Sequence, residues 1–125
     1  MSAVGLPATA RDIGSLAELA VAACAKAIDA FLAQNAYEAY AVWEGDAAMD
    51  DIHDRLMARF EEELRLPGAQ VEALLAGRSI ASSLERIGDH AARIAKVVIY
   101  MRLGEIVRHR PFSADKTLSD LRRSL

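Results

Sequence analysis

The sequence has little of what disulfide-bonded, membrane-spanning or loop-rich proteins need. It holds one cysteine, Cys24, so no internal disulfide and no thiolate metal cluster can form. No apolar run approaches the ~18 residues that span a membrane, and no secretory signal is visible at the start. With 7 Gly and 3 Pro among 125 residues, of which 53% are hydrophobic, long helices are favoured. These absences predict a cytoplasmic, all-α protein.

Patterns of the common enzyme and nucleotide sites are also missing. The chain has no glycine-rich phosphate loop, and its serines at 79–83 lie on no glycine-flanked nucleophile elbow. A net charge of −3 gives no general attraction for nucleic acid. Charge is uneven, because residues 44–63 carry eight acids against two bases and residues 102–125 carry six bases against three acids. We therefore predict a non-enzymatic protein without a nucleic-acid partner.

Apolar residues recur at helical spacing in the first half of the chain. The first helix is expected to begin near Thr9, as its N-cap, and to carry a buried stripe from Ile13 to Phe31. Asn35 is a reasonable terminator for it. A second helix covers about residues 36–65 and stops at Leu66-Pro67-Gly68, because proline cannot continue a helix. Its apolar side is formed by Val42, Met49, Ile52, Leu56 and Phe60.

The third helix has the most regular pattern. Seven residues follow one another at alternating spacings of four and three, as in a coiled-coil seam: Ile80, Leu84, Ile87, Ala91, Ile94, Val98 and Met101. Gly104 is expected to end this helix. Short links force antiparallel neighbours, so the sequence predicts an antiparallel up-down-up three-helix bundle over residues 8–104, spectrin-repeat-like in its architecture. Residues 105–125 are expected to form a basic C-terminal tail, with one possible short helix over 114–125.

Two acidic pairs stand at four-residue spacing, Asp46 with Asp50 and Glu85 with Asp89. Each pair shares one helix face at the edge of the apolar stripe, and antiparallel packing can bring the pairs together. Four oxygen donors in one patch suit Mg, Mn, Fe(III) and also Zn. The alternative is that all four are surface acids paired with nearby arginines. His53, three residues after Asp50, is either a nitrogen ligand or a residue at the core boundary.

The stretch Ser83-Leu84-Glu85-Arg86-Ile87-Gly88-Asp89-His90-Ala91 resembles the signature of PhoU-type phosphate-signalling proteins. Upstream, Asp46-Ala47-Ala48-Met49-Asp50 matches the second acidic motif of that family, an acid followed four residues later by Asp. The two motifs occur in the expected order and separation, and the likeness spans about residues 10–110. The chain resembles the C-terminal one of the two three-helix repeats that family members usually carry.

This resemblance implies a three-helix bundle that regulates and does not catalyse. It implies metal binding through Asp46, Asp50, Glu85 and Asp89, with an iron or zinc cluster and with magnesium or manganese as further candidates. It also implies restraint of phosphate uptake and of the phosphate-starvation response, through a phosphate ABC transporter ATPase subunit and a sensor histidine kinase. Because only one repeat is present, we expect a homodimer to replace the second. The alternative function is a metal-binding bundle with a storage, chaperone or scaffolding role unrelated to phosphate.

Overall fold

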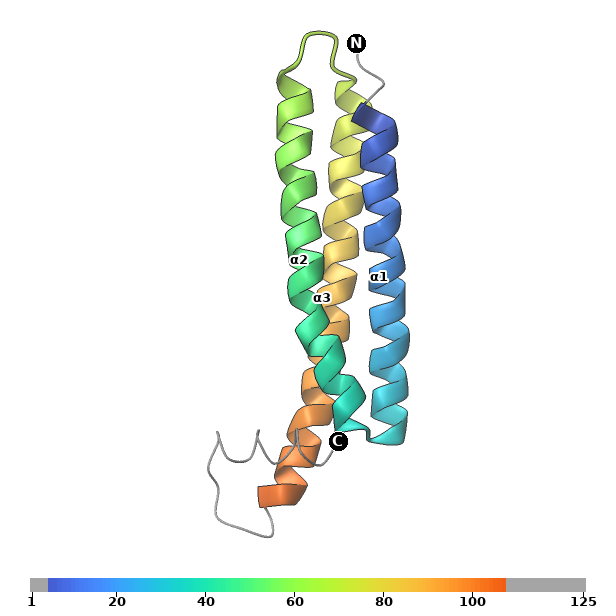
Figure 1. The fold of residues 1–125 in the computed structure, drawn as a ribbon, viewed down its shortest axis with the longest axis vertical. Coiled ribbons are helices and arrows are strands. Elements are labelled where there is room, and N and C mark those ends of the chain that lie inside the picture. The colour runs from blue at the N-terminus through green and yellow to red at the C-terminus, as the bar shows by residue number, and fades with distance from the viewer. Residues whose placement is uncertain (1–4, 108–125) are drawn as a thin grey trace.

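Three long α-helices make up the part of the chain that the structure describes, residues 5–107 (Figure 1). The computed structural model places α1 at Gly5–Ala33, α2 at Ala36–Arg65 and α3 at Val71–Val107. The three helices lie side by side and alternate in direction, and no strand occurs within these residues. The predicted all-α, up-down-up bundle is confirmed, and the bounds of α2 agree with the segment expected from the sequence.

The link between α1 and α2 is only two residues long. Gln34 takes a left-handed backbone conformation, with φ of 53°, and this reverses the chain. Asn35 then caps α2, because its side-chain oxygen accepts hydrogen bonds from the backbone N–H groups of Tyr37 (3.0 Å) and Glu38 (3.2 Å). Because the link is so short, α2 runs antiparallel to α1 and packs against it.

The link between α2 and α3 follows the predicted break. Pro67 cannot donate a backbone hydrogen bond to continue α2. Gly68 has φ of 74°, a conformation that glycine adopts without steric cost. The chain therefore turns here and sends α3 back along α2, parallel to α1 (Figure 1).

The core consists of two clusters of buried side chains stacked along the bundle. The cluster near the first link is rich in alanine, which lets the helices approach closely; it contains Ala27, Ala30, Ala36, Ala39, Val42, Ala91, Ala95, Val98 and Ile99. The cluster near the second link carries the larger side chains Leu16, Met49, Leu56, Phe60 and Leu74, together with Ala20 and Ala81. Most of the large buried residues thus lie at one end of the bundle, and most of the small ones lie toward the other.

The buried side of α3 follows the predicted seam only in part, because Ala91 and Val98 are buried and Leu84 and Ile94 are half-buried. Ile80, Ile87 and Met101 are 51%, 40% and 42% exposed, so the prediction that the whole seam is buried is wrong. A second stripe of mostly small residues, spaced by seven, four, three and four, also faces the core, beside the buried seam residues Ala91 and Val98: Ala81, Gly88, Ala92, Ala95 and Ile99. Small side chains let α3 lie close between its two neighbours, which turns the larger residues toward the edge of the bundle.

Three smaller expectations also need correction. Thr9 is not an N-cap, because α1 begins at Gly5 and Thr9 is a buried residue inside it. Phe31, expected in the buried stripe, is exposed. Gly104 does not end α3, which continues to Val107 and so passes the predicted boundary of the bundle at residue 104; a single glycine costs a helix only about 1 kcal/mol. The possible helix at 114–125 lies outside the described residues.

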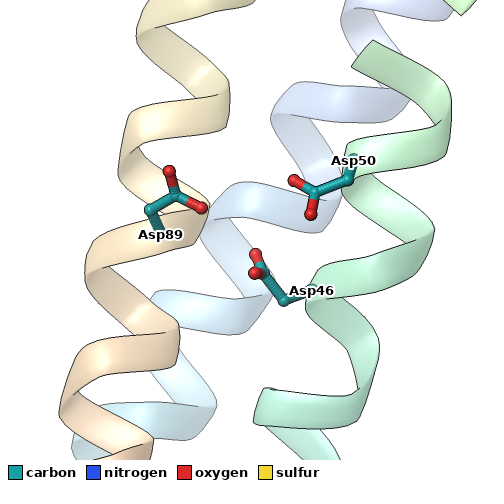
Figure 2. Close-up of side chains that lie close together, drawn as sticks. All are labelled: Asp46, Asp50 and Asp89. Atoms are coloured by element: carbon teal, nitrogen blue, oxygen red, sulfur yellow. The ribbon is translucent and has the colours of Figure 1, made fainter. Parts of the chain in front are cut away.

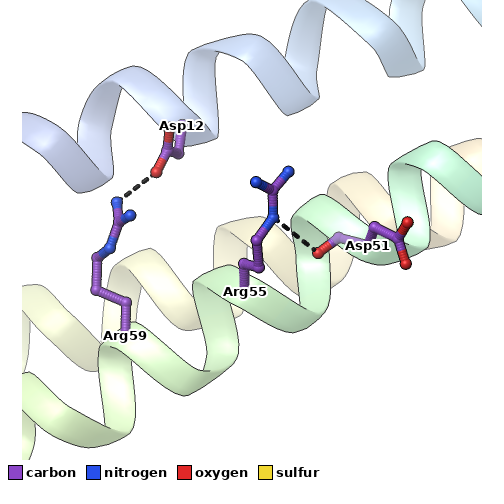
Figure 3. Close-up of polar contacts among 4 residues, drawn as sticks. All are labelled: Asp12, Asp51, Arg55 and Arg59. Carbon is purple, nitrogen blue, oxygen red and sulfur yellow. Dashed lines mark hydrogen bonds and ion pairs between the residues drawn. The ribbon is translucent and has the colours of Figure 1, made fainter.

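One charged pair joins α1 to α2 across their interface. The Arg59 guanidinium donates a hydrogen bond to the Asp12 carboxylate (Figure 3). Four residues earlier, the Arg55 Nε donates to the backbone carbonyl of Asp51 at 3.4 Å, within α2. Both groups of the Arg59–Asp12 pair are partly exposed, so it contributes at most about 1 kcal/mol and helps mainly to fix the alignment of the two helices.

Candidate metal centre

Three of the four carboxylates singled out in the sequence meet between α2 and α3. Asp46 and Asp50 project from α2 and Asp89 projects from α3, all toward one another (Figure 2). One carboxylate oxygen from each lies within 4.8 Å of the others, and all three side chains are half-buried. The four-residue spacing places Asp46 and Asp50 on one face of α2, and the antiparallel course of α3 brings Asp89 against that face.

Glu85 lies beside this group but is not part of the close set of three. It is one turn before Asp89 on α3, and its carboxyl group is close enough to that of Asp89 for the interaction to raise the pKa of Glu85. His53 is near enough to act electrostatically on both Asp50 and Glu85. The His53 Nδ1 is 3.7 Å from the Asp54 carboxylate, and its Nε2 is buried without a hydrogen-bond partner among the described residues. Glu85 and His53 therefore border the three aspartates.

The site concentrates negative charge that the protein only partly compensates. Partial burial raises the pKa of Asp46, and the charges of Asp50 and Asp89 raise it further, while Lys96 acts in the opposite direction. Burial, followed by the Asp89 charge, likewise raises the pKa of Asp50. Burial also raises the pKa of Glu85, with the interaction with Asp89 next in importance. Asp46, Asp50 and Glu85 are thus harder to ionise in the folded protein than in water.

The alternative that these acids are paired with arginines finds no support in the described part of the chain. None of the ion pairs there joins an arginine to Asp46, Asp50, Glu85 or Asp89. The cation that does reach the site electrostatically is Lys96, whose Nζ lies 5.8 Å from the centre of the Trp43 ring. The Trp43 ring in turn meets the Tyr40 ring edge to face, with the ring centres 5.8 Å apart.

The donor set fits a hard cation. Carboxylate oxygens are the ligands that Mg²⁺, Mn²⁺ and Ca²⁺ prefer, and Fe(III) accepts them as well. Two oxygens that bind one ion are separated by at most twice the metal–oxygen distance, about 4 Å for Mg²⁺ and about 5 Å for Ca²⁺. A separation within 4.8 Å is therefore close to the required geometry. Asp46, Asp50 and Asp89 would hold such an ion, and its charge would offset their mutual repulsion.

Gly88, which lies beside Asp89, permits the close approach of the two helices. A Cβ at this position would lie 2.5 Å from the Met49 Cε and 2.8 Å from its Sδ, with the Asp46 Oδ1 at 3.9 Å. Both Met49 atoms belong to the end of a flexible but buried side chain, so an added methyl group would force the Met49 thioether out of its present position. This role of Gly88 was not predicted from the sequence, although a glycine inside a helical pattern is a signal for close packing.

Gly88→Ala should therefore destabilise the protein by about 1–2 kcal/mol, because overpacking outweighs the gain in helix propensity. The matched control is Gly45→Ala on α2, where a Cβ would meet nothing within 4 Å. That variant should be more stable than wild type by about 0.5–1 kcal/mol. Urea unfolding followed by circular dichroism measures both, and equal effects at the two positions would contradict the steric explanation.

The raised pKa values predict how pH changes the effect of removing one carboxylate. Below about pH 3 these groups are almost entirely neutral in both states. As pH rises, the unfolded chain ionises first and the wild-type folded state loses relative stability, because ionisation of Asp46, Asp50 and Glu85 is disfavoured there. Asp50→Asn should thus be more stable than wild type at pH 7, in the presence of EDTA, by on the order of 1 kcal/mol.

Thermal unfolding at a series of pH values tests this. The difference between Asp50→Asn and wild type should shrink toward zero below about pH 3 and grow as pH rises from the ordinary pKa of Asp50 through its raised pKa in the folded protein. Asp51→Asn, at the exposed neighbouring position, is the control and should show a smaller difference. A variant that is less stable than wild type at pH 7 would mean that the repulsion is absent.

Fold and site together define a class: a three-helix bundle with a half-buried carboxylate cluster between two of its helices. Residues 13–98 match the PhoU domain model, so the chain belongs to the PhoU family. The matched region contains all three aspartates and Glu85. The predicted family membership is confirmed.

Two curated relatives illustrate the similarity. A phosphate-specific transport system accessory protein PhoU homolog 1 from Thermotoga maritima is 30% identical over 79 residues, which cover 63% of this chain and 34% of that protein. A phosphate-specific transport system accessory protein PhoU homolog from Rhizobium meliloti is 29% identical over 95 residues, covering 76% of this chain and 40% of that protein. The chain thus spans well under half the length of these relatives. No solved structure matches significantly.

Membrane insertion receives no support from the helices that the structure describes. None of them has a stretch both long enough and apolar enough to cross a bilayer.

Proposed function

We propose that this protein is a non-enzymatic, metal-binding regulator of phosphate uptake and of the phosphate-starvation response. The observation that carries the proposal is the convergence of Asp46, Asp50 and Asp89, with oxygens within 4.8 Å, in a bundle of the PhoU family. Both relatives described above are named as accessory proteins of phosphate-specific transport systems, which supports a role beside a transporter. In this role the protein is cytoplasmic and acts by contact.

The proposed partners are the ATPase subunit of a phosphate ABC transporter and its sensor histidine kinase, and the proposed assembly is a homodimer. Asp46, Asp50 and Asp89 hold the metal, and Glu85 supports Asp89 from the adjacent turn. Iron and zinc clusters are candidates, as are magnesium and manganese. A donor set made of carboxylates favours the harder ions, since the three close ligands include neither a thiolate nor an imidazole.

Metal binding can be tested with a reporter that the chain already contains. Trp43 is its single tryptophan, one turn before Asp46 on α2. After removal of metals with EDTA, each of Fe(III), Mn²⁺, Zn²⁺ and Mg²⁺ is titrated while the fluorescence of Trp43 and the melting temperature are followed. An ion at 100 times its Kd should stabilise the protein by about 2.7 kcal/mol. No response to any of the four ions would contradict the metal site.

The control is the triple variant Asp46→Asn/Asp50→Asn/Asp89→Asn, which keeps the shape of the side chains and removes their charge. It should fold and show no response to metal. The link to phosphate is tested separately, by capture of the transporter ATPase subunit from phosphate-replete cells with the wild-type protein. Metal binding without capture would favour the second candidate, a metal-binding bundle unrelated to phosphate, which the carboxylate cluster alone is sufficient to support.

A further inference from the structure

A continuous uncharged face runs along the groove between α1 and α3, opposite the edge of α3 that carries Asp89. Large aliphatic side chains stand exposed along it, with Val21 at 68%, Ile28 at 49% and Leu32 at 73% on α1, and with Ile80, Ile87 and Met101 on α3. We define the strip by positions that share one side of each helix and include no Lys, Arg, Asp or Glu: Gly14, Ala17, Val21, Ala25, Ile28 and Leu32 on α1, and Ala76, Ile80, Ser83, Ile87, Ile94 and Met101 on α3. Such an exposed apolar strip is typical of a protein–protein contact.

Two contacts fix how the helices are aligned. The Cys24 Sγ lies 3.8 Å from the backbone carbonyl of Ile87, so these residues stand at the same height. Near the other end, a Cβ built on Gly77 would lie 3.6 Å from the Ile13 Cδ1. Both pairs are separated by almost the same number of positions, 63 and 64, as expected for two helices that run side by side in one direction (Figure 1).

We propose that this α1–α3 face binds the same face of a second copy of the chain. Each α1 packs along the partner's α3, in the same direction, around a two-fold axis parallel to the helices. The inference rests on the homodimer part of the proposed function and is independent of its metal-binding part. It leaves Asp46, Asp50 and Asp89 open on the other side of the bundle.

Charge at the borders of the strip favours a second copy in this orientation. On α1, Glu18 follows the strip residue Ala17, and Asp29 follows the strip residue Ile28. Because each residue of an α-helix is rotated by 100° from the one before, both acids lie on the outer border of the strip. Arg86 and Arg93 each precede a strip isoleucine on α3, which places them on the other outer border. All four are exposed. From Glu18 to Asp29 the α1 margin therefore carries acids, and the α3 margin carries bases at Arg86 and Arg93, so two copies complement each other over this stretch. Arg11, seven residues before Glu18 on the same margin of α1, carries the opposite charge.

The heights of these charges agree with the parallel arrangement. Asp29 is five residues beyond Cys24 and Arg93 is six beyond Ile87, so Asp29 meets the partner's Arg93 when α1 lies along the partner's α3. The other possible two-fold axis, perpendicular to the helices, would pair α1 with an antiparallel copy of itself. Glu18 and Asp29 lie six before and five after Cys24, so that pairing would bring two acids together at both ends.

The apolar side chains interleave in the same arrangement. Cys24 on α1 and Ile87 on α3 lie at the same height along the bundle. On α1, Val21 is three residues before Cys24 and Ile28 is four residues after it. On α3, Ile80 is seven residues before Ile87. Val21 thus falls between Ile80 and Ile87 of the partner, and Ile28 falls beyond the partner's Ile87. Side chains at alternating heights fill one another's gaps, which is the packing that coiled-coil helices use.

The first test measures the mass of the assembly by sedimentation equilibrium in the presence of EDTA. Wild type should be a dimer, and Val21→Lys should be a folded monomer, with a dimer dissociation constant raised at least 100-fold. Val71→Lys is the matched control, because Val71 is a valine 49% exposed at the start of α3 and away from the strip; it should remain dimeric. A monomeric wild type at high concentration, or a dimeric Val21→Lys, would overturn the proposal.

The second test fixes the orientation. Asp29→Arg and Arg93→Asp should each weaken the dimer, and the double variant should restore it. In a Cys24→Ser background, a mixture of Asp29→Cys and Arg93→Cys chains should form a disulfide-linked dimer, whereas Asp29→Cys alone should not. Cross-linking of Asp29→Cys with itself, or no rescue in the double variant, would rule out this arrangement. Because EDTA is present throughout, failure here is separate from failure of the metal site.

Discussion

Asp89→Ala should lower the affinity of the protein for its metal by at least about 100-fold, equivalent to roughly 2.7 kcal/mol, while the bundle stays folded. Asp89 is the member of the close group that comes from α3, and the other two both stand on α2. Without it, an ion would be held by one helix alone and would no longer join α2 to α3. The metal-induced rise in melting temperature should therefore be lost together with the affinity.

Two control variants distinguish a carboxylate that binds the metal directly from one that only adds negative charge nearby. Asp51→Ala removes the same charge from an exposed position next to Asp50 and should leave the affinity within a few-fold of wild type. Glu85→Ala should lower it by about tenfold, the size of effect seen when a group that orients a ligand is removed. Isothermal titration with the ion that binds wild type measures all three variants. Equal losses for Asp51→Ala and Asp89→Ala would mean that only the overall charge matters.

The carboxylate site could be predicted from the sequence because it depends on the spacing of the acids along each helix and on the relative direction of the helices. Four-residue spacing places Asp46 and Asp50 on one helix face whatever the details of packing. The two short links then make α2 and α3 antiparallel, which brings Asp89 to that face. Glu85 satisfies the same spacing, yet it lies just outside the close group, because the relative height of two helices depends on packing. That height is fixed by contacts such as Met49 against Gly88, which spacing does not reveal.

The rotation of α3 could not be predicted for a similar reason. Its sequence contains two stripes with heptad-like spacing, one of isoleucine, leucine and methionine and one mostly of alanine and glycine. Hydrophobicity favours the first, but a helix between two neighbours gains more from close contact along the second. The structure buries Ala81, Gly88 and Ala95 and leaves Ile80 and Ile87 at the edge. The same rotation produces the exposed strip through which we expect two copies to associate.

Phe60→Ala and Ile87→Ala should therefore differ strongly, although a pattern reading of the sequence assigns both to the core. Phe60 is buried, and its ring lies so close to α3 that a Cβ on Gly77 would come within 3.1 Å of it. Its truncation leaves a cavity that the rigid helices cannot close, at a cost of about 3–5 kcal/mol. Ile87 is already 40% exposed, so its truncation should cost the folded monomer about 1 kcal/mol or less.

Urea unfolding of both variants in the Val21→Lys background measures these costs without the contribution of the dimer. In the wild-type background, Ile87→Ala should additionally weaken self-association, while Phe60→Ala should not, as long as the bundle remains folded. If Ile87→Ala lowers the free energy of unfolding of the monomer as much as Phe60→Ala does, Ile87 lies in the core. In that case α3 buries the stripe of isoleucines, as the sequence pattern predicts. A small cost in the monomer combined with a weaker dimer is the result that the exposed strip requires.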